Sequence, residues 1–351
     1  MTSPLNSPVP LSVLDLATVG TGHTASEALA TSTELARRAE EWGFHRYWVA
    51  EHHSMPGVAS ASPAVLLAHL AAATSTIRLG SGGVMLPNHA PLVIAEQFGL
   101  LEALHPGRID LGLGRAPGTD QATARALRRS AEALSVDDFP QQLAELIRFL
   151  DDSFPEGHPY ARIHAIPGPV QGKVPGGVQS ASRPPVWLLG SSGYSARLAG
   201  ALGLPFSFAH HFSPANTLPA LEIYRESFRP SEVLDKPYAM VAAGVIAADT
   251  EKEARSSARA GALAMLRLRT GRPGLFPSPE EADGYPFNEL EREFVDSWLS
   301  NVIHGDRDKV RQGLDDLRAL TDADELMLTS NVHGRERRLR SYEIVAQAHR
   351  S

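Results

Sequence analysis

Arg108-Ile-Asp-Leu-Gly-Leu-Gly-Arg-Ala-Pro-Gly-Thr-Asp120 is the segment from which the fold of this chain is most readily worked out. Its first half alternates as a short β-strand does, and its two glycines allow a backbone or a ligand to come close. The strand ends at Arg115, and a Pro-Gly pair predicts a turn shortly after it. A guanidinium at the exit of a strand is suited to bind an anion. From this segment alone, an ordinary surface arginine is the favoured interpretation.

Strand-like and helix-like segments alternate on both sides of this stretch. A capping box from Thr24 to Glu27 predicts the start of one helix, and prolines at positions 63 and 91 predict two more. Strands are predicted at residues 11–16, 47–50, 77–86, 108–112, 185–189, 205–209, 238–247 and 325–329. Such alternation indicates a parallel sheet, and eight strand–helix units in 351 residues favour one (β/α)8 TIM barrel over two domains.

Two segments interrupt the alternation. Residues 153–183 are rich in proline and glycine, which predicts an inserted loop or hairpin. Residues 270–288 are rich in proline and have little periodicity, so we expect a mobile lid there. Residues 122–134 and 139–150 are predicted to be helical. We therefore expect a single domain over residues 1–351, with one insert and one lid.

The composition is that of an ordinary globular enzyme, with 43% hydrophobic and 21% charged residues. The formal charge of −7 argues against non-specific binding of nucleic acid, which needs a basic face. The chain has no cysteine, which excludes disulfides, thiolate metal sites and cysteine nucleophiles. No apolar run approaches the length of a membrane span, and the first ten residues do not resemble a signal peptide. We expect a cytoplasmic protein that does not bind a membrane.

Active sites of (β/α)8 barrels lie at the C-terminal ends of the strands. Five of the predicted strand ends carry glycines or chemically active side chains: Glu51-His52-His53, Gly82-Gly83, Arg115, Ser191-Ser192 and His210-His211. One polar strand end is common in any protein. Five of them on the same rim predict a functional site.

Glu51, His52 and His53 provide one acid and two imidazoles. Adjacent side chains of an extended chain point in opposite directions, so at most two of the three share a pocket. A histidine beside an orienting carboxylate is suited to acid–base catalysis. A hydrogen-bonded structural histidine explains these three residues equally well. They form a weak candidate for a metal site, because further ligands are not evident.

Gly190-Ser-Ser-Gly-Tyr-Ser195 connects a strand exit to the start of a helix. Free backbone N–H groups and the helix dipole favour an anion at such a place, and Ser191 and Ser192 add hydroxyl donors. Simple N-capping by either serine is the alternative. Combined with Arg115, the segment favours a phosphate. That phosphate would belong to a bound cofactor, because neither a Walker lysine nor a pair of magnesium-binding acids accompanies it.

The chain resembles the bacterial-luciferase-like flavin monooxygenases, and most of all their single-chain bacterial members. The resemblance covers most of residues 11–214, while the last third is similar mainly in pattern. Its motifs are Trp48-Val-Ala-Glu-His-His53, Gly80-Ser-Gly-Gly-Val-Met-Leu-Pro87, Gly107-Arg-Ile-Asp-Leu-Gly-Leu-Gly-Arg115, Leu189-Gly-Ser-Ser-Gly-Tyr-Ser195 and Gly203-Leu-Pro205.

This resemblance implies a (β/α)8 barrel that binds reduced FMN supplied by a separate flavin reductase. The flavin is expected to react with O2 to give a hydroperoxide, which oxygenates an apolar small organic substrate. By the same resemblance, Arg115 and Ser192, with Gly193 and Tyr194, are expected to hold the FMN phosphate. Ser191 stands where the luciferase alpha chain has a glutamate near that phosphate. No separate beta chain is evident, so we expect a homodimer formed through the helices that follow strands two and three.

Three further expectations concern the reaction itself. Gly82-Gly83 matches the family's cis peptide between two non-proline residues, which lies against the isoalloxazine ring. His52 matches the catalytic histidine, with Glu51 as the neighbouring carboxylate. His211 is expected to face the substrate if the sixth strand ends there, although a structural role for this histidine is equally compatible with the sequence.

Three alternatives remain open. A deazaflavin-dependent dehydrogenase on the same barrel would transfer hydride and need no oxygen. A flavin-binding protein without turnover is a second alternative, which the presence of both His52 and Arg115 disfavours. A metal-dependent barrel hydrolase would use His52, His53, His210 and His211 as ligands. The last is the least favoured, because it leaves the phosphate-binding residues without a purpose.

Overall fold

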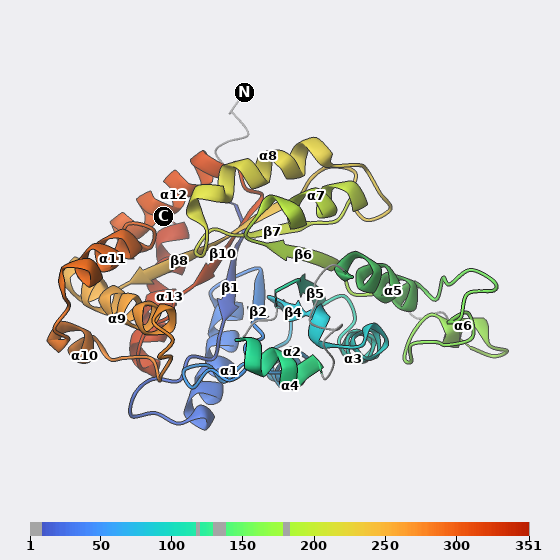
Figure 1. The fold of residues 1–351 in the computed structure, drawn as a ribbon, viewed down its shortest axis with the longest axis horizontal. Coiled ribbons are helices and arrows are strands. Elements are labelled where there is room, and N and C mark those ends of the chain that lie inside the picture. Colours follow the sequence, from blue (N-terminus) through green and yellow to red (C-terminus); the bar gives the residue numbers. More distant parts are fainter. Residues whose placement is uncertain (1–8, 117–119, 129–137, 178–182, 351) are drawn as a thin grey trace.

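The computed structural model describes residues 9–116, 120–128, 138–177 and 183–350, and it contains a closed barrel of parallel strands (Figure 1). β10 pairs with both β1 and β8, which closes the sheet on itself. The predicted TIM-barrel fold is confirmed. In order around the barrel, the strands are β1 (Leu11–Asp15), β2 (Arg46–Val49), β3 (Arg78–Ser81), β5 (Ile109–Gly114), β6 (Val186–Gly190), β7 (Phe206–Ala209), β8 (Ala239–Ala247) and β10 (Glu325–Thr329).

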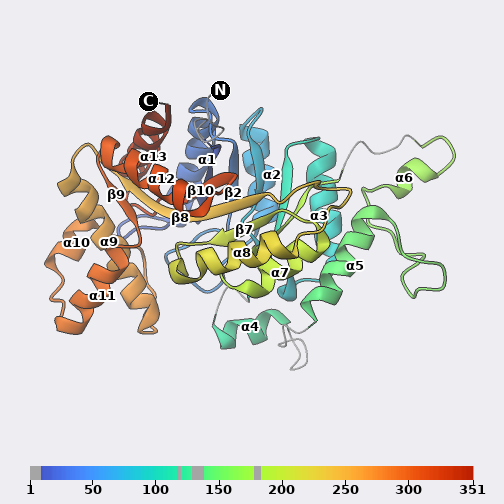
Figure 2. The same ribbon diagram turned by 90° about the horizontal axis from the view of Figure 1, so that it is seen from above.

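Helices surround the strands, as the view from above shows (Figure 2). The helices that follow the barrel strands are α1 (Ala25–Glu41), α2 (Pro63–Ala73), α3 (Pro91–Leu104), α5 (Phe139–Asp151), α7 (Gly193–Leu202), α8 (Thr217–Ser227), α12 (Arg307–Thr321) and α13 (Arg335–Arg350). The predicted capping box is present, because the Thr24 side chain accepts from the backbone of Glu27 and the Glu27 side chain accepts from Thr24. No helix among the described residues combines the length and the apolar character that a membrane crossing requires.

Side chains alternate between the helix layer and the barrel interior, as the two-residue period of a strand requires. Outward residues such as Val13 and Tyr47 belong to the large apolar cluster under the helices. Inward residues form a separate small cluster with two tryptophans, Trp48 and Trp187, whose rings meet edge to face with centroids 5.2 Å apart. The interior of the barrel is thus filled at mid-height by large side chains.

Charged side chains fill the lower end of the barrel, where the strands begin. Arg46 on β2 donates to the Glu325 carboxylate on β10 over 3.1 Å and to Asp110 on β5 over 2.8 Å. Arg78 and the indole N–H of Trp48 also donate to Asp110. Both carboxylates are fully buried, so this ion-pair network, which we call the barrel floor, forms part of the core.

The strand predicted over residues 77–86, with breaks at Gly80, Gly82 and Gly83, is divided into two in the structure. β3 ends at Ser81, and a second short strand, β4 (Val84–Met85), pairs with the end of β5. The peptide bond between Gly82 and Gly83, which lies between these strands, is cis. The close approach expected at Gly112 is made by backbone, because a Cβ there would collide with the carbonyl oxygen of Ser81.

Several elements lie outside the eight-unit pattern. They are α4 (Gln121–Arg128), α6 (Val170–Lys173), α9 (Glu251–Arg269), α10 (Pro279–Gly284), α11 (Glu289–Leu299), β9 (Ile303–Gly305) and the 3-10 helices η2 (Leu86–Asn88) and η4 (Pro214–Asn216). α4 covers the first part of the helix predicted at 122–134, and the remainder of that prediction lies outside the described residues. α11 and β9 are additions that the sequence reasoning did not predict.

The two irregular segments differ in their structure. The described part of the insert is a loop that carries only the short helix α6, and it projects away from the barrel at the right of Figure 1. The segment expected to be a lid contains α10 and is joined to the loop after β1. In that connection, the backbone N–H of Phe276 donates to Val19 and the N–H of Thr21 donates to Phe276.

Candidate active site at the carboxyl ends of the strands

The predicted site residues all follow directly after barrel strands. His52 comes after β2, Gly82 after β3, Arg115 after β5, Ser191 after β6 and His211 after β7. All these strands run parallel, so their carboxyl ends meet at one rim of the barrel. The fold therefore brings these residues to one rim, although they are distant in the sequence.

Arg115 follows β5 in the chain, and its side chain contacts the first turn of α7. Its guanidinium carbon is 4.2 Å from the centroid of the Tyr194 ring, in a cation–π contact. β5 and β6 are neighbours in the barrel, which places the two segments side by side. Among the described residues, no carboxylate forms an ion pair with Arg115. The positive charge of this arginine is therefore available to a ligand.

The serines at this position remain exposed. Ser192 is the N-cap residue of α7, but its side chain makes no capping hydrogen bond. The hydroxyl of Ser192 therefore does not cap the helix, which was the alternative to anion binding. Gly193 begins the helix, and Ser191 and Tyr194 are also exposed. Hydroxyls, a guanidinium and the free N–H groups of a helix start lie together here, which is a donor set suited to a phosphate.

The Gly82-Gly83 peptide is closely surrounded. A Cβ at Gly82 would lie 2.6 Å from Leu14 Cδ1, and one at Gly83 would lie 2.8 Å from the carbonyl oxygen of Gly112. Neither position accepts a side chain without a shift of its neighbours. The backbone itself therefore forms this part of the rim.

Glu51 is fully buried and holds the loop after β3. Its carboxylate lies 2.8 Å from Nε2 of His53 and 2.9 Å from Nε2 of His89, and it accepts from the backbone N–H of Met85 over 3.0 Å. Burial raises the pKa of the Glu51 carboxyl, but the histidines and this N–H outweigh burial and leave the pKa below its ordinary value. Glu51 and His53 are thus the two residues of the triplet that share an environment.

His52 points elsewhere. Among the described contacts, its side chain makes no hydrogen bond with Glu51, and the histidine of the triplet that lies beside this carboxylate is His53. Nδ1 of His52 is buried and has no hydrogen-bond partner among the described residues. Burial lowers the pKa of His52, which favours the neutral ring near pH 7. A buried, unpartnered ring nitrogen at a strand end is suited to meet a ligand.

His211 is held in one tautomer. Its Nδ1 lies 2.9 Å from the carbonyl oxygen of Ala242 on β8, and its backbone N–H donates to the same oxygen over 3.1 Å. Burial, together with the charges of His210 and His52, lowers the pKa of His211 to about 4, although the hydrogen bond with Ala242 acts in the opposite direction. β2 and β7 stand opposite each other in the eight-strand ring, so His52 and His211 approach the mouth from opposite sides.

The four histidines proposed as metal ligands do not converge. His53 turns to Glu51, and Nδ1 of His210 lies 2.8 Å from the hydroxyl of Thr217 on α8. Within the described ranges, no three side chains of histidine, aspartate or glutamate form a group that could hold a metal ion. His89, which contacts Glu51, was not predicted as a site residue. Its one signal in the sequence is that Asn88 and His89 are polar residues at the end of an apolar segment.

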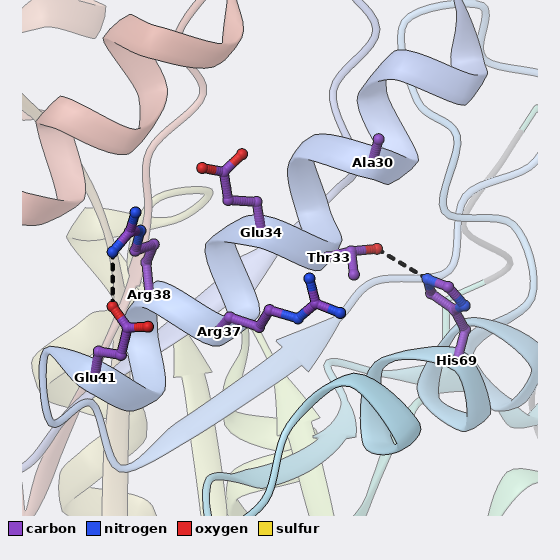
Figure 3. Close-up of a pocket in the computed structure, with 7 residues that line it drawn as sticks. All are labelled: Ala30, Thr33, Glu34, Arg37, Arg38, Glu41 and His69. Atoms are coloured by element: carbon purple, nitrogen blue, oxygen red, sulfur yellow. Dashed lines mark hydrogen bonds and ion pairs between the residues drawn. The ribbon is translucent and has the colours of Figure 1, made fainter.

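A surface groove of about 560 Å³ lies far from this rim, on the outer face of α1 (Figure 3). Its charged side chains already have partners, since Glu34 pairs with Arg335 and Arg37 donates to the carbonyl oxygen of Ala73. Arg38 pairs with Glu41 over 2.8 Å, and Thr33 lies 3.0 Å from Nε2 of His69 on α2. The groove is open and polar and contains none of the predicted site residues, so the rim remains the candidate site.

A (β/α)8 barrel with histidines and an anion-binding corner on its carboxyl rim defines an enzyme of the TIM-barrel class. The model of the family described as luciferase-like monooxygenase matches residues 9–324 of the chain. The chain belongs to the luciferase-like monooxygenase family, which confirms both the resemblance and the enzyme class.

Named relatives agree with this assignment. A luciferase-like monooxygenase of Escherichia coli is 47% identical over 336 residues, which is 96% of each chain. An N-acetyl-S-alkylcysteine monooxygenase of Bacillus subtilis is 34% identical over 342 residues, covering 96% of this chain and 97% of the relative. The crystal structure of apo-MsnO8 has 35% identity and a TM-score of 0.85 over 98% of both chains.

More distant structures share the fold alone. The oxygenating constituent of 3,6-diketocamphane monooxygenase of Pseudomonas putida, in complex with FMN, has 19% identity and a TM-score of 0.68, covering 97% of this chain and 98% of that one. An F420-dependent secondary alcohol dehydrogenase has 15% identity and a TM-score of 0.63, covering 98% of this chain and all of the other.

Proposed function

We propose that this chain is an FMN-dependent monooxygenase that uses reduced flavin and O2 to oxygenate an apolar small organic molecule. The observation that carries the proposal is the position of Arg115 beside Tyr194, at the start of α7, with no carboxylate partner among the described residues. Two related proteins are named as monooxygenases, and one of them acts on an N-acetyl-S-alkylcysteine, which supports a small organic substrate.

The residues present fit a flavin phosphate. A dianionic phosphate needs several charge-assisted donors, and the guanidinium of Arg115, the hydroxyls of Ser191 and Ser192 and the N–H groups of Gly193 and Tyr194 provide them. Ser192 keeps its hydroxyl free of a capping bond, as such a role requires.

The remaining rim residues fit the other end of the flavin. Gly82-Gly83 offers bare backbone to a flat ring, and His52 offers an unpartnered nitrogen. A bound reduced flavin supplies the electrons for O2 activation. In the proposed mechanism His52 holds or moves a proton at its Nδ1, beside the reacting atoms. Its lowered pKa keeps the ring neutral, so that it begins as a proton acceptor.

We further propose that the reduced flavin comes from a separate reductase in the cytoplasm and that the chain works as a homodimer. α2 and α3 support the dimer, because they expose large apolar side chains: Val65, Val93, Leu100 and Leu104, whose exposed fractions are 69%, 44%, 50% and 60%. α2 follows β2, and α3 follows β3 and β4, so these are the two helices expected to form the dimer contact. Large exposed apolar side chains on neighbouring helices are typical of protein–protein interfaces when they form one patch.

The proposal is tested by the binding of FMN and riboflavin, which differ only in the phosphate. We expect Arg115→Ala to weaken FMN binding roughly tenfold to a hundredfold, the range for hydrogen bonds to charged groups, and to leave riboflavin binding unchanged. Arg197→Ala is the matched control, because it removes the same charge from an exposed site on α7, the helix whose first turn contacts Arg115. Fluorescence titration measures the affinities of the unmodified protein and of both variants for the two flavins.

Equal FMN affinity in Arg115→Ala, or an equal loss in Arg197→Ala, would contradict the proposed phosphate site. The cofactor itself is tested with reduced FMN and reduced deazaflavin in parallel. Oxygen consumption that depends on reduced FMN supports the monooxygenase. Hydride transfer from reduced deazaflavin without oxygen consumption would instead establish the dehydrogenase alternative.

A further inference from the structure

The ring of His211 presents one fixed face to the barrel mouth. A carbonyl oxygen only accepts hydrogen bonds, so the nitrogen that contacts Ala242, Nδ1, carries the hydrogen of the neutral ring. The other nitrogen, Nε2, is then a bare acceptor. It makes no hydrogen bond with any described residue, although the ring is only partly exposed.

The charge state of this acceptor is also fixed. The pKa of His211 lies near 4, so the ring is neutral throughout the physiological range. A protonated ring would carry a donor on Nε2, whereas the neutral ring with its hydrogen on Nδ1 has none there. Nε2 therefore accepts a hydrogen bond and does not offer one.

His211 follows β7, which is next to β6 in the ring and is not one of the strands that carry the proposed phosphate and Gly82-Gly83 contacts. The proposed phosphate site lies at the ends of β5 and β6, and the Gly82-Gly83 backbone lies between β3 and β4. β7 and β8 continue the ring beyond β6, and at their paired ends Ala209 and Ala242 face the barrel interior. Small side chains beside an acceptor leave room for an organic molecule.

We propose that Nε2 of His211 is a permanent hydrogen-bond acceptor in the substrate site, and that it selects organic substrates that carry an O–H or N–H donor beside the apolar part. The inference rests on the proposed monooxygenase function and adds the substrate class to it. A substrate without such a donor leaves Nε2 dehydrated and unpaired, which costs binding free energy.

The ring state is tested first, and without any ligand. The protein is labelled with 15N-histidine, and the signals of His211 among the 14 histidines are assigned by their loss in His211→Phe. From pH 5 to pH 8 we expect Nδ1 to bear the hydrogen and Nε2 to bear none. A hydrogen on Nε2 in that range would overturn the inference, whatever the cofactor is.

The selection is tested with two matched pairs of probes, in the presence of saturating oxidised FMN. One pair is N-acetyl-S-benzylcysteine and its N-methylated amide, and the other is 4-ethylphenol and 4-ethylanisole. Each pair differs in one donor hydrogen. We expect the donor member of at least one pair to bind about tenfold more tightly, the effect of about one hydrogen bond, and to shift the Nε2 signal of His211.

Two variants locate the effect. His211→Phe keeps a ring of similar size and should abolish the preference for the donor member. His210→Phe makes the same change at the neighbouring residue, whose ring turns to Thr217 on α8, and should keep the preference. A preference that survives in His211→Phe, a preference in neither pair, or binding of neither pair would overturn the inference.

The same samples separate this inference from the proposed function. If His211→Phe loses affinity for FMN itself, His211 serves the cofactor and the inference is overturned while the flavin proposal stands. If the unmodified protein does not bind FMN, the proposed function fails, and the state of the His211 ring is still read from its nitrogen signals.

Discussion

The guanidinium of Arg115, at the end of β5, stacks on the ring of Tyr194, in the first turn of α7, at 4.2 Å from its centroid. A stacked guanidinium is fixed in orientation, while the N–H groups in its own plane remain free to donate. The contact therefore orients a cation at a helix start, where backbone N–H groups already favour an anion. Arg115 and Tyr194 together form the corner on which the proposed flavin site depends.

The Tyr194 ring should matter through its face and not through its hydroxyl. We predict that Tyr194→Leu weakens FMN binding about threefold to fivefold, since a partly exposed cation–π contact contributes roughly 0.5–1 kcal/mol. Tyr194→Phe should bind FMN as the unmodified protein does. Fluorescence titration of both variants decides this point, and an equal loss in the two would assign the effect to the hydroxyl instead.

His52 should be needed for the reaction and not for binding. We predict that His52→Ala lowers the rate of oxygenated product formation about a hundredfold, the lower range for general acid–base catalysis, with unchanged affinity for FMN. The assay supplies reduced FMN with a flavin reductase and uses N-acetyl-S-benzylcysteine or 4-ethylphenol. His210→Ala is the control at another strand end. An undiminished product rate in His52→Ala would remove the proton-transfer role.

The barrel floor should be the most sensitive polar part of the fold. Arg46→Met leaves the carboxylates of Asp110 and Glu325 buried without their shared partner, and we predict a loss of about 3–5 kcal/mol in the free energy of unfolding. Arg38→Met, which breaks only the exposed pair with Glu41, should change it by less than about 1 kcal/mol. Urea denaturation measures both, and similar values for the two variants would refute the structural role of the floor.

His211 should make the fold sensitive to acid. Its pKa is 6.5 in the unfolded chain and about 4 in the fold, so between these values the unfolded chain binds more protons. Stability is therefore fully present above pH 6.5 and falls as the pH drops, by up to about 3 kcal/mol at pH 4. The pKa values of His52 and His210 are lowered too and act in the same direction. His211→Phe should show a shallower loss of stability in urea denaturation at pH 7.5, 6 and 5, and an unchanged slope would contradict this.

Local signals were sufficient to predict the barrel. The eight strand–helix units were predicted from periodicity, from the capping box at Thr24 and from prolines at helix starts, and the structure confirms them. β9 escaped prediction because three residues are too few to show alternation. α11 could have been found, because Asn288 and Glu291 form a capping box at its start.

The candidate site was predicted as a set of strand ends, and the sequence could not show which side chains meet. Glu51 was expected beside His52, but its partners are His53 and His89, and the second of these lies in a different loop. The barrel floor was missed for the same reason, since its charged residues belong to four different strands. The local signal for the floor is a charged residue at the first position of an otherwise apolar strand, as at Arg46 and Glu325.

The charged network across the base of the barrel also determines how small molecules travel. Because Arg46, Asp110 and Glu325 occupy that end, the interior has no through passage, and whatever enters must leave by the same opening. If a flavin and an organic molecule bind at this rim as proposed, both reach the site through the same opening. We therefore expect the component that sits deeper to bind first and to leave last.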